Sequence, residues 1–230
     1  MNALIQPLVT FARRYKTYQL VIAFILFWAP VILFSKIAGE IVERAPIGLD
    51  VTILNWIHDQ ASPLLDGIFL FFTTAGNVEF MLAFTAIIIG FLLYKHQRTN
   101  ALIIAFSVGG AAAANLILKD LFHRDRPAFW HSLITETGYS FPSGHAMISS
   151  ALIIGLIVLL WNTKWRLTSI IVGGFIVLMI GLSRLYLGVH YPTDVVAGWS
   201  AGFIWALLVA MIVRDFSPVL KDRLKNRLKK

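Results

Sequence analysis

The chain has 230 residues, of which 58% are hydrophobic and only 14% are charged, and its mean hydropathy is +0.75. A soluble domain of this length carries about a quarter charged residues. The composition therefore excludes an ordinary soluble protein and indicates a single-domain integral membrane protein. Cysteine is absent, which excludes disulfides, thiolate catalysis and cysteine-ligated metal sites.

Six apolar segments are long enough, or nearly so, to cross about 30 Å of hydrocarbon as helices at about 1.5 Å per residue. Basic residues at 13, 14 and 16 precede the first segment, as in a signal peptide, but its apolar run is too long and no A-x-A site follows, so we expect an uncleaved anchor. The sequence thus predicts an all-α, six-helix membrane bundle, with spans near 18–38, 78–94, 100–118, 142–160, 167–183 and 195–213.

Two shorter apolar segments lie between the first and second spans. Segment 63–75 has only 13 residues and contains Asp66, Thr73 and Thr74, which favours an interfacial or re-entrant helix over a span. Segment 50–59 has the pattern of a short amphipathic helix. We expect the two to form a small cap outside the membrane.

The distribution of charge orients the bundle. The segments assigned to the inside hold 14 basic and 2 acidic residues, whereas those assigned to the outside hold 6 basic and 10 acidic residues. The positive-inside rule then places both termini in the cytoplasm. The basic tail, 221–230, is expected to attract anionic lipid headgroups and not nucleic acid. The membrane core is expected at about 50–213 and the cytoplasmic tail at 214–230.

The first polar motif follows the third span and reads K-x6-R-P. Lys119 ends that span, and Pro127 biases Arg126 toward extended backbone, so the chain turns off the helix there. Lys119 and Arg126 can thus face one pocket, although a lysine at a helix end also snorkels to lipid headgroups without any further role. No site role is assigned to the intervening residues His123, Arg124 and Asp125.

The second motif, PSGH, begins the fourth span. Ser143 after Pro142 is a good N-cap, and an anion binds readily to the unpaired amides of a helix start. Gly144 leaves room for close approach, and His145 follows in the first turn. A plain helix cap with an interfacial histidine is the alternative.

The third motif, S-R-x5-H-x3-D, joins the last two spans. Arg184 ends the fifth span, Pro192 suits the first turn of the sixth, and His190 and Asp194 flank that proline. The Asp194 carboxylate can accept a hydrogen bond from one imidazole nitrogen and leave the other to attack. A capping aspartate beside a surface histidine is one alternative. A His190–Asp194 metal site is another, but it lacks a third ligand.

Together the three motifs resemble those of the phosphatidic acid phosphatase type 2 (PAP2) superfamily, and they follow one another in the same order as in that superfamily. The resemblance covers roughly residues 50–213. The six-span layout resembles its bacterial lipid phosphatases, notably those of phosphatidylglycerophosphate phosphatase B type. The resemblance implies that His190 is the nucleophile that forms a phosphohistidine, that Asp194 orients it, and that His145 is the general acid. It also implies a phosphate cradle without metal or other cofactor, made of Lys119, Arg126, Ser143, Gly144 and Arg184.

The expected activity is hydrolysis of a lipid phosphate or pyrophosphate at the extracytoplasmic face. Three cations can compensate phosphoryl charge, and phosphoryl transfer depends mainly on positioning and such compensation. A lipid phosphotransferase and a transporter of phosphorylated solutes are the alternatives; the site residues lie at one face and not at the midplane, which disfavours transport. The lipid is expected to enter sideways, between the third and fourth spans, beside the small residues of 109–114.

Overall fold

The computed structural model describes residues 17–43 and 48–227, and this part of the chain is helical without strands. The basic residues at 13, 14 and 16 and the last three residues of the tail lie outside the described residues. The helices are α2 (Thr17–Val42), α3 (Gly48–His58), α4 (Pro63–Ala75), α5 (Val78–Tyr94), α6 (Arg98–Phe122), α7 (Gly144–Leu160), α8 (Arg166–Tyr186) and α9 (Pro192–Arg227). The prediction of an all-α fold is confirmed.

Each predicted span coincides with a helix. Four helical stretches are long and apolar enough to cross a membrane by themselves: Phe24–Val42, Arg98–Phe122, Arg166–Tyr186 and Pro192–Arg214. The pair α4 and α5 satisfies the same criterion together, bent by 53° at the break between them, as in a broken span or a re-entrant segment. Helix α7 is apolar but shorter, with 17 residues.

Helix α7 is the centre of the bundle and packs against α5, α6, α8 and α9. Its residues from Gly144 to Leu152 are all buried. Close approach to α9 depends on two glycines of that helix. A Cβ on Gly198 would lie 2.6 Å from the Ser143 carbonyl oxygen, and one on Gly202 would lie 2.2 Å from the Met147 carbonyl oxygen.

Small residues of α6 allow this helix to pack closely against α7 and α9, and they do not form an opening. A Cβ on Gly110 would lie 2.3 Å from the Trp205 ring of α9, and Ala111 is fully buried beside Met147, Ala151 and Ala206. Close helix packing is therefore present at Gly110 and Ala111. The placement of a lipid entrance between α6 and α7 is not supported, because these helices are closely packed there.

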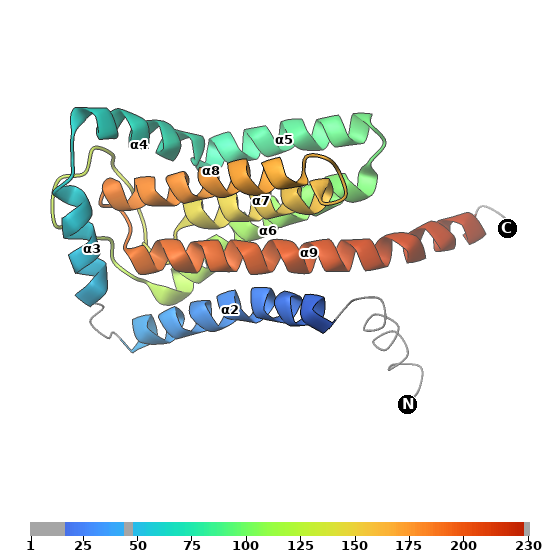
Figure 1. The fold of residues 1–230 in the computed structure, drawn as a ribbon, viewed down its shortest axis with the longest axis horizontal. Helices are drawn as coiled ribbons and strands as arrows, with labels where there is room; N and C mark the ends of the chain where they lie inside the picture. The colour runs from blue at the N-terminus through green and yellow to red at the C-terminus, as the bar shows by residue number, and fades with distance from the viewer. Residues whose placement is uncertain (1–16, 44–47, 228–230) are drawn as a thin grey trace.

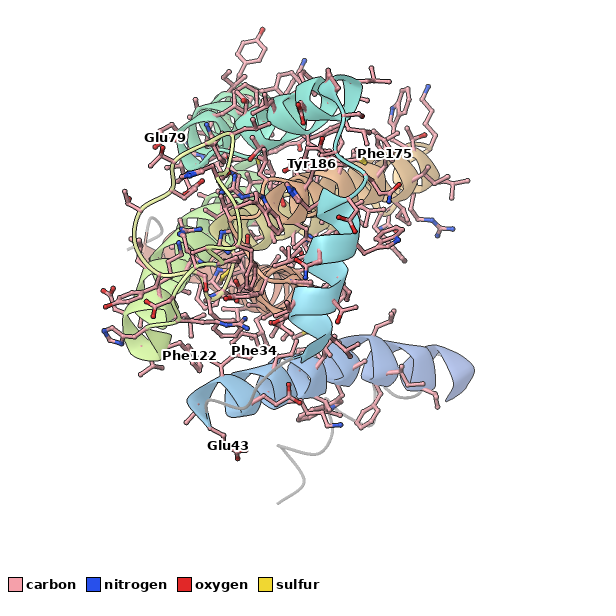
Figure 2. The ribbon with its side chains drawn as sticks, turned by 90° about the vertical axis from the view of Figure 1, so that its left-hand side faces the viewer. Phe34, Glu43, Glu79, Phe122, Phe175 and Tyr186 are labelled. Carbon is pink, nitrogen blue, oxygen red and sulfur yellow. The ribbon has the colours of Figure 1, made fainter. Side chains whose placement is uncertain are left out.

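The polar motifs meet at one end of the bundle. Figure 1 shows the turns that join α5 to α6 and α7 to α8 at the opposite end from α3. Viewed onto the α3 end, α3 crosses from α2 to α4, and the connection from α6 to α7 runs over the other side (Figure 2). Helix α3 and the connection from α6 to α7 thus cover this end of the bundle. Helix α4 does not, since it packs lengthwise on α8, with Phe69 against Tyr186 and Phe72 against Phe175.

A matched pair of glycine substitutions tests the packing of α7 on α9. Gly202→Ala should lower the free energy of unfolding by about 2 kcal/mol, because the methyl group meets backbone atoms that cannot move aside. Gly90→Ala in α5 has open space around it and should stabilise the helix by up to about 1 kcal/mol. Thermal unfolding in one detergent measures both, and equal shifts for the two variants would contradict the packing argument.

Candidate active site

The residues of the three motifs come from the end of α6, the start of α7, the end of α8 and the start of α9. Among them, Arg184 and Asp194 are fully buried and His190 is 1% exposed. Charged groups removed from water in this way must be paired or hydrogen-bonded, and such residues at membrane-helix ends mark functional sites. The structure thus brings together residues that are up to 75 positions apart in the sequence.

Histidine 190 has a defined tautomer. Arg126 Nη1 lies 3.1 Å from His190 Nε2 and also donates to the Val189 carbonyl oxygen at 2.9 Å. A guanidinium can only donate, so Nε2 must hold a lone pair and Nδ1 must carry the proton. Nδ1 faces Asp194 Oδ2 at 3.4 Å, which is too long for a good hydrogen bond.

The same surroundings keep this imidazole neutral. Burial, together with the positive charges of Arg184, Arg126 and Lys119, holds the pKa of His190 well below its ordinary value of 6.5. The ring is therefore neutral at physiological pH, with its Nε2 lone pair on the side of the cations. This is the state that a nitrogen nucleophile requires.

Asp194 is held by Arg124, a residue to which the sequence analysis assigns no role. Arg124 Nη1 donates to Asp194 Oδ1 at 2.5 Å and its Nη2 donates to Asp50 Oδ2 at 2.8 Å, while the Tyr191 amide donates to Asp194 Oδ2 at 2.9 Å. Asp50 also accepts from the amide of Thr193 at 3.0 Å. Arg124 thus ties α3 to the start of α9. Its spacing of two from Arg126 was the available signal, since alternate residues of an extended segment face the same side.

Arg184 and Arg126 share a carboxylate that the sequence analysis also missed. Glu136, in the connection from α6 to α7, forms a hydrogen-bonded ion pair with Arg184 and lies 3.6 Å from Arg126. Arg184 donates a further hydrogen bond to Thr73 of α4. The side-chain ammonium of Lys119 has no hydrogen-bond partner among the described residues, but its charge interacts with those of Arg126, Arg184 and Glu136. The Glu136 carboxylate therefore occupies an anion position between the cations.

The PSGH segment lies as predicted, with one difference. Ser143 is the residue before α7, but its hydroxyl makes no capping hydrogen bond and is buried without a partner. A hydroxyl left unpaired in this way is available to a bound anion. Gly144 is required by a neighbour, because a Cβ there would lie 2.9 Å from Asn115 Oδ1. His145 Nε2 lies 3.0 Å from Oδ1 of Asn77, a third residue that the sequence analysis missed.

Within the described part of the chain, no group of three or more histidine and acidic side chains has an arrangement that could hold a metal ion. The donors of the site are instead cations, hydroxyls and His145 Nε2, which faces an amide oxygen, and its acceptors are Glu136, Asp194 and His190 Nε2. This set suits an anion with several oxygens.

Comparison with known proteins agrees with that chemistry. The chain is 32% identical to the phosphatidylglycerophosphatase B of Bacillus subtilis, over 82% of this chain and 93% of the relative. It is 28% identical to an undecaprenyl-diphosphatase of Sulfolobus acidocaldarius, over 90% and 96% of the two chains. The crystal structure of a transmembrane PAP2-type phosphatidylglycerolphosphate phosphatase from Bacillus subtilis superposes with a TM-score of 0.70 at 28% identity, covering 82% of this chain and 96% of that one.

The model of the PAP2 superfamily matches residues 100–218. This range contains every residue of the three motifs and also Arg124, which contacts the start of α9. The chain is a multi-pass membrane protein and belongs to the PAP2 superfamily.

Proposed function

We propose that this protein hydrolyses lipid phosphate or pyrophosphate monoesters through a phosphohistidine on His190, without a metal ion. The observation that carries the proposal is the neutral imidazole of His190, whose Nε2 lone pair is held beside Arg126 and close to Arg184 and Lys119. Relatives named as phosphatases support hydrolysis as the reaction class, and this chain is accordingly a phosphatase. The candidate substrates are phosphatidylglycerophosphate, phosphatidate, diacylglycerol pyrophosphate and undecaprenyl pyrophosphate.

The first step transfers the phosphoryl group to the enzyme. The Nε2 lone pair of His190 attacks phosphorus, an N–P bond forms, and the P–O bond to the leaving alkoxide or phosphate breaks. His145 gives a proton to the leaving oxygen. Lys119, Arg126 and Arg184 compensate the charge on the equatorial oxygens, and the unpaired Ser143 hydroxyl donates a further hydrogen bond.

The second step regenerates the enzyme. Water attacks the phosphorus of the phosphohistidine and gives its proton to His145, which now acts as a base. The N–P bond breaks, its electron pair returns to Nε2 of His190, and inorganic phosphate leaves. Asp194 stays ionised and stabilises the positive charge that the ring carries while it is phosphorylated.

We further propose that the site faces the extracytoplasmic side of a six-span bundle with cytoplasmic termini. The support is the excess of basic residues in the segments at the end opposite to α3. The lipid would enter sideways from the outer leaflet, because exposure of each methylene to water costs about 0.8 kcal/mol. The phosphate site lies at the α3 end of helices with many exposed apolar side chains, which fits a tail that stays in the hydrocarbon.

The deciding experiment measures phosphate release from a panel of purified lipid phosphates in detergent, with EDTA present throughout. Release at rates unaffected by EDTA is the expected result. Loss of activity in EDTA that Mg²⁺ or Zn²⁺ restores would exclude the metal-free mechanism. Phosphate transfer to an added lipid acceptor without release would identify a phosphotransferase. If neither release nor transfer is detected, the transporter alternative is supported.

The pH profile tests the state of the nucleophile. His190 must be neutral to attack, and its pKa in the free enzyme is well below 6.5. The ascending limb of kcat/KM should therefore have its midpoint below 6.5, since the reactive neutral form predominates above the lowered pKa. His190→Ala should abolish phosphate release. A midpoint at or above 6.5 in the wild type would contradict the predicted state, and near-normal turnover in the variant would exclude His190 as the nucleophile.

Glu136 should compete with phosphate for the arginines. Glu136→Gln removes the carboxylate that pairs with Arg184 and Arg126, so inorganic phosphate should inhibit the variant at about tenfold lower concentration, equivalent to about 1.4 kcal/mol. The matched control is Asp125→Asn, which removes one negative charge from an exposed position of the same connection. Equal inhibition constants for Glu136→Gln and the wild type would show that Glu136 does not occupy the phosphate position.

Arg124 should be needed for both stability and rate. Arg124→Ala leaves the buried carboxylates of Asp50 and Asp194 without their shared cation, which should cost about 3 kcal/mol of folding free energy. Arg124→Lys should retain part of both properties, because an ammonium cannot bridge the two carboxylates as a planar guanidinium does. Thermal unfolding and kcat/KM measure the two effects. Full activity of Arg124→Ala would show that Asp194 does not depend on this contact.

A further inference from the structure

The break between α4 and α5 carries an asparagine whose side chain is not used as a helix cap. Asn77 is the residue before α5, where an asparagine usually gives its side-chain oxygen to a backbone amide of the first turn. Here the side chain makes no such bond, and its Oδ1 lies 3.0 Å from His145 Nε2. The helix start thus gives up a capping bond, and the asparagine contacts a site residue 68 positions away.

The geometry of this contact assigns the two nitrogens of His145. An amide oxygen can only accept, so the His145 Nε2 that faces it must carry a proton in every state of the ring. The other nitrogen, Nδ1, has no hydrogen-bond partner among the described residues. Unlike His190 Nδ1, it is not completely shielded from solvent. Nδ1 is then the nitrogen that can gain and lose a proton.

We infer that Asn77 is a positioning residue that holds His145 Nε2–H, so that His145 exchanges its catalytic proton through Nδ1. The inference rests on the acid and base roles proposed for His145. In the first step the Nδ1 proton passes to the leaving oxygen as the P–O bond breaks, and the ring becomes neutral. In the second step Nδ1 takes a proton from the attacking water, and Asn77 accepts from Nε2 throughout.

The neighbouring glycine supports a site built around this ring. A Cβ on Gly76 would lie 3.0 Å from His145 Cδ2 and 2.6 Å from a methyl carbon of Ile180. Only a residue without a side chain lets the chain pass so close to the imidazole. The Gly76–Asn77 pair therefore lies close to the His145 ring at Cδ2 and contacts it at Nε2, and this arrangement restricts how the ring can turn.

The test compares two phosphomonoesters that differ in their need for an acid. Dioctanoyl phosphatidate has an alkoxide leaving group that needs protonation, whereas p-nitrophenyl phosphate has a good leaving group that does not. The measured quantity is the ratio of kcat/KM for p-nitrophenyl phosphate to kcat/KM for dioctanoyl phosphatidate, because kcat/KM reports the phosphorylation step and not the hydrolysis of the phosphohistidine that both substrates share. His145→Ala should raise this ratio by about a hundredfold, the lower range of general acid catalysis. Asn77→Ala should raise it by about tenfold, because the ring keeps its acid group but loses its fixed orientation.

Three further variants separate positioning from folding and from the direction of the hydrogen bond. Asn77→Ser keeps a good capping residue but is too short to reach the ring, so it should behave like Asn77→Ala even where the alanine variant folds poorly. Asn77→Asp keeps an acceptor and has no amide hydrogens, so it should retain the wild-type ratio. Asn100→Ala, at the far end of α6, is the control and should change nothing.

The double variant decides whether Asn77 acts through His145. In the His145→Ala background, Asn77→Ala should leave the ratio unchanged within about twofold, because residues that act as a unit are not additive. An unchanged ratio in Asn77→Ala and Asn77→Ser, or a full further effect in the double variant, would overturn the inference. An Asn77→Asp variant with the same defect as alanine would also overturn it, because the ring would then accept and not donate.

The acid role of His145 and the positioning role of Asn77 can be disproved separately. If His145→Ala does not change the ratio, the proposed acid role of His145 is wrong, and the inference on Asn77 falls with it. If His145→Ala changes the ratio and the Asn77 variants do not, the acid role stands and only the positioning role is excluded.

Discussion

The guanidinium of Arg184 is fully buried at the end of a membrane helix, and a charge in that place must be compensated by its immediate neighbours. Thr73 and Glu136 supply two of its hydrogen bonds, and Glu136 lies near Arg126 as well. With Lys119, the cluster holds three cations and one carboxylate. The excess of positive charge is what an incoming phosphate can neutralise, so this imbalance of charge favours binding of an anion.

A second cluster, on the other side of His190, has the opposite balance. Arg124 is bound by two buried carboxylates, Asp50 and Asp194, so this cluster carries a net negative charge. His190 lies between the two clusters, with Nε2 toward Arg126 and Nδ1 toward Asp194. The cations disfavour a proton on Nε2, and the carboxylate stabilises the one on Nδ1. The polarity of the ring is therefore set by the division of charge around it, even though the contact with Asp194 is long.

Much of this fold is predictable from the sequence because long apolar runs and end-of-helix charges are local signals. The helices lie where the runs do, and the motifs meet because an alternation of spans brings every second connection to one end. The residues that escaped prediction are Arg124, Asp50, Glu136, Asn77 and Thr73, and their contacts join parts of the chain up to 143 positions apart. Their partners depend on how α3, α4 and the connection from α6 to α7 fold over the site, and no local pattern encodes that. Segment 63–75 shows the same limit: its length was clear, but its packing along α8 was not.

The bend between α4 and α5 shows how one irregularity can serve both halves of the site. A straight helix through this point would present side chains at positions 73 and 77 one turn apart on a single face. The break lets Thr73 accept from Arg184 while Asn77 accepts from His145, and Gly76 lets the chain pass close to the imidazole. Arg184, proposed to bind phosphate, and His145, proposed as the acid, thus both contact the same turn of backbone. A shift of α4 along α8 would move both contacts together.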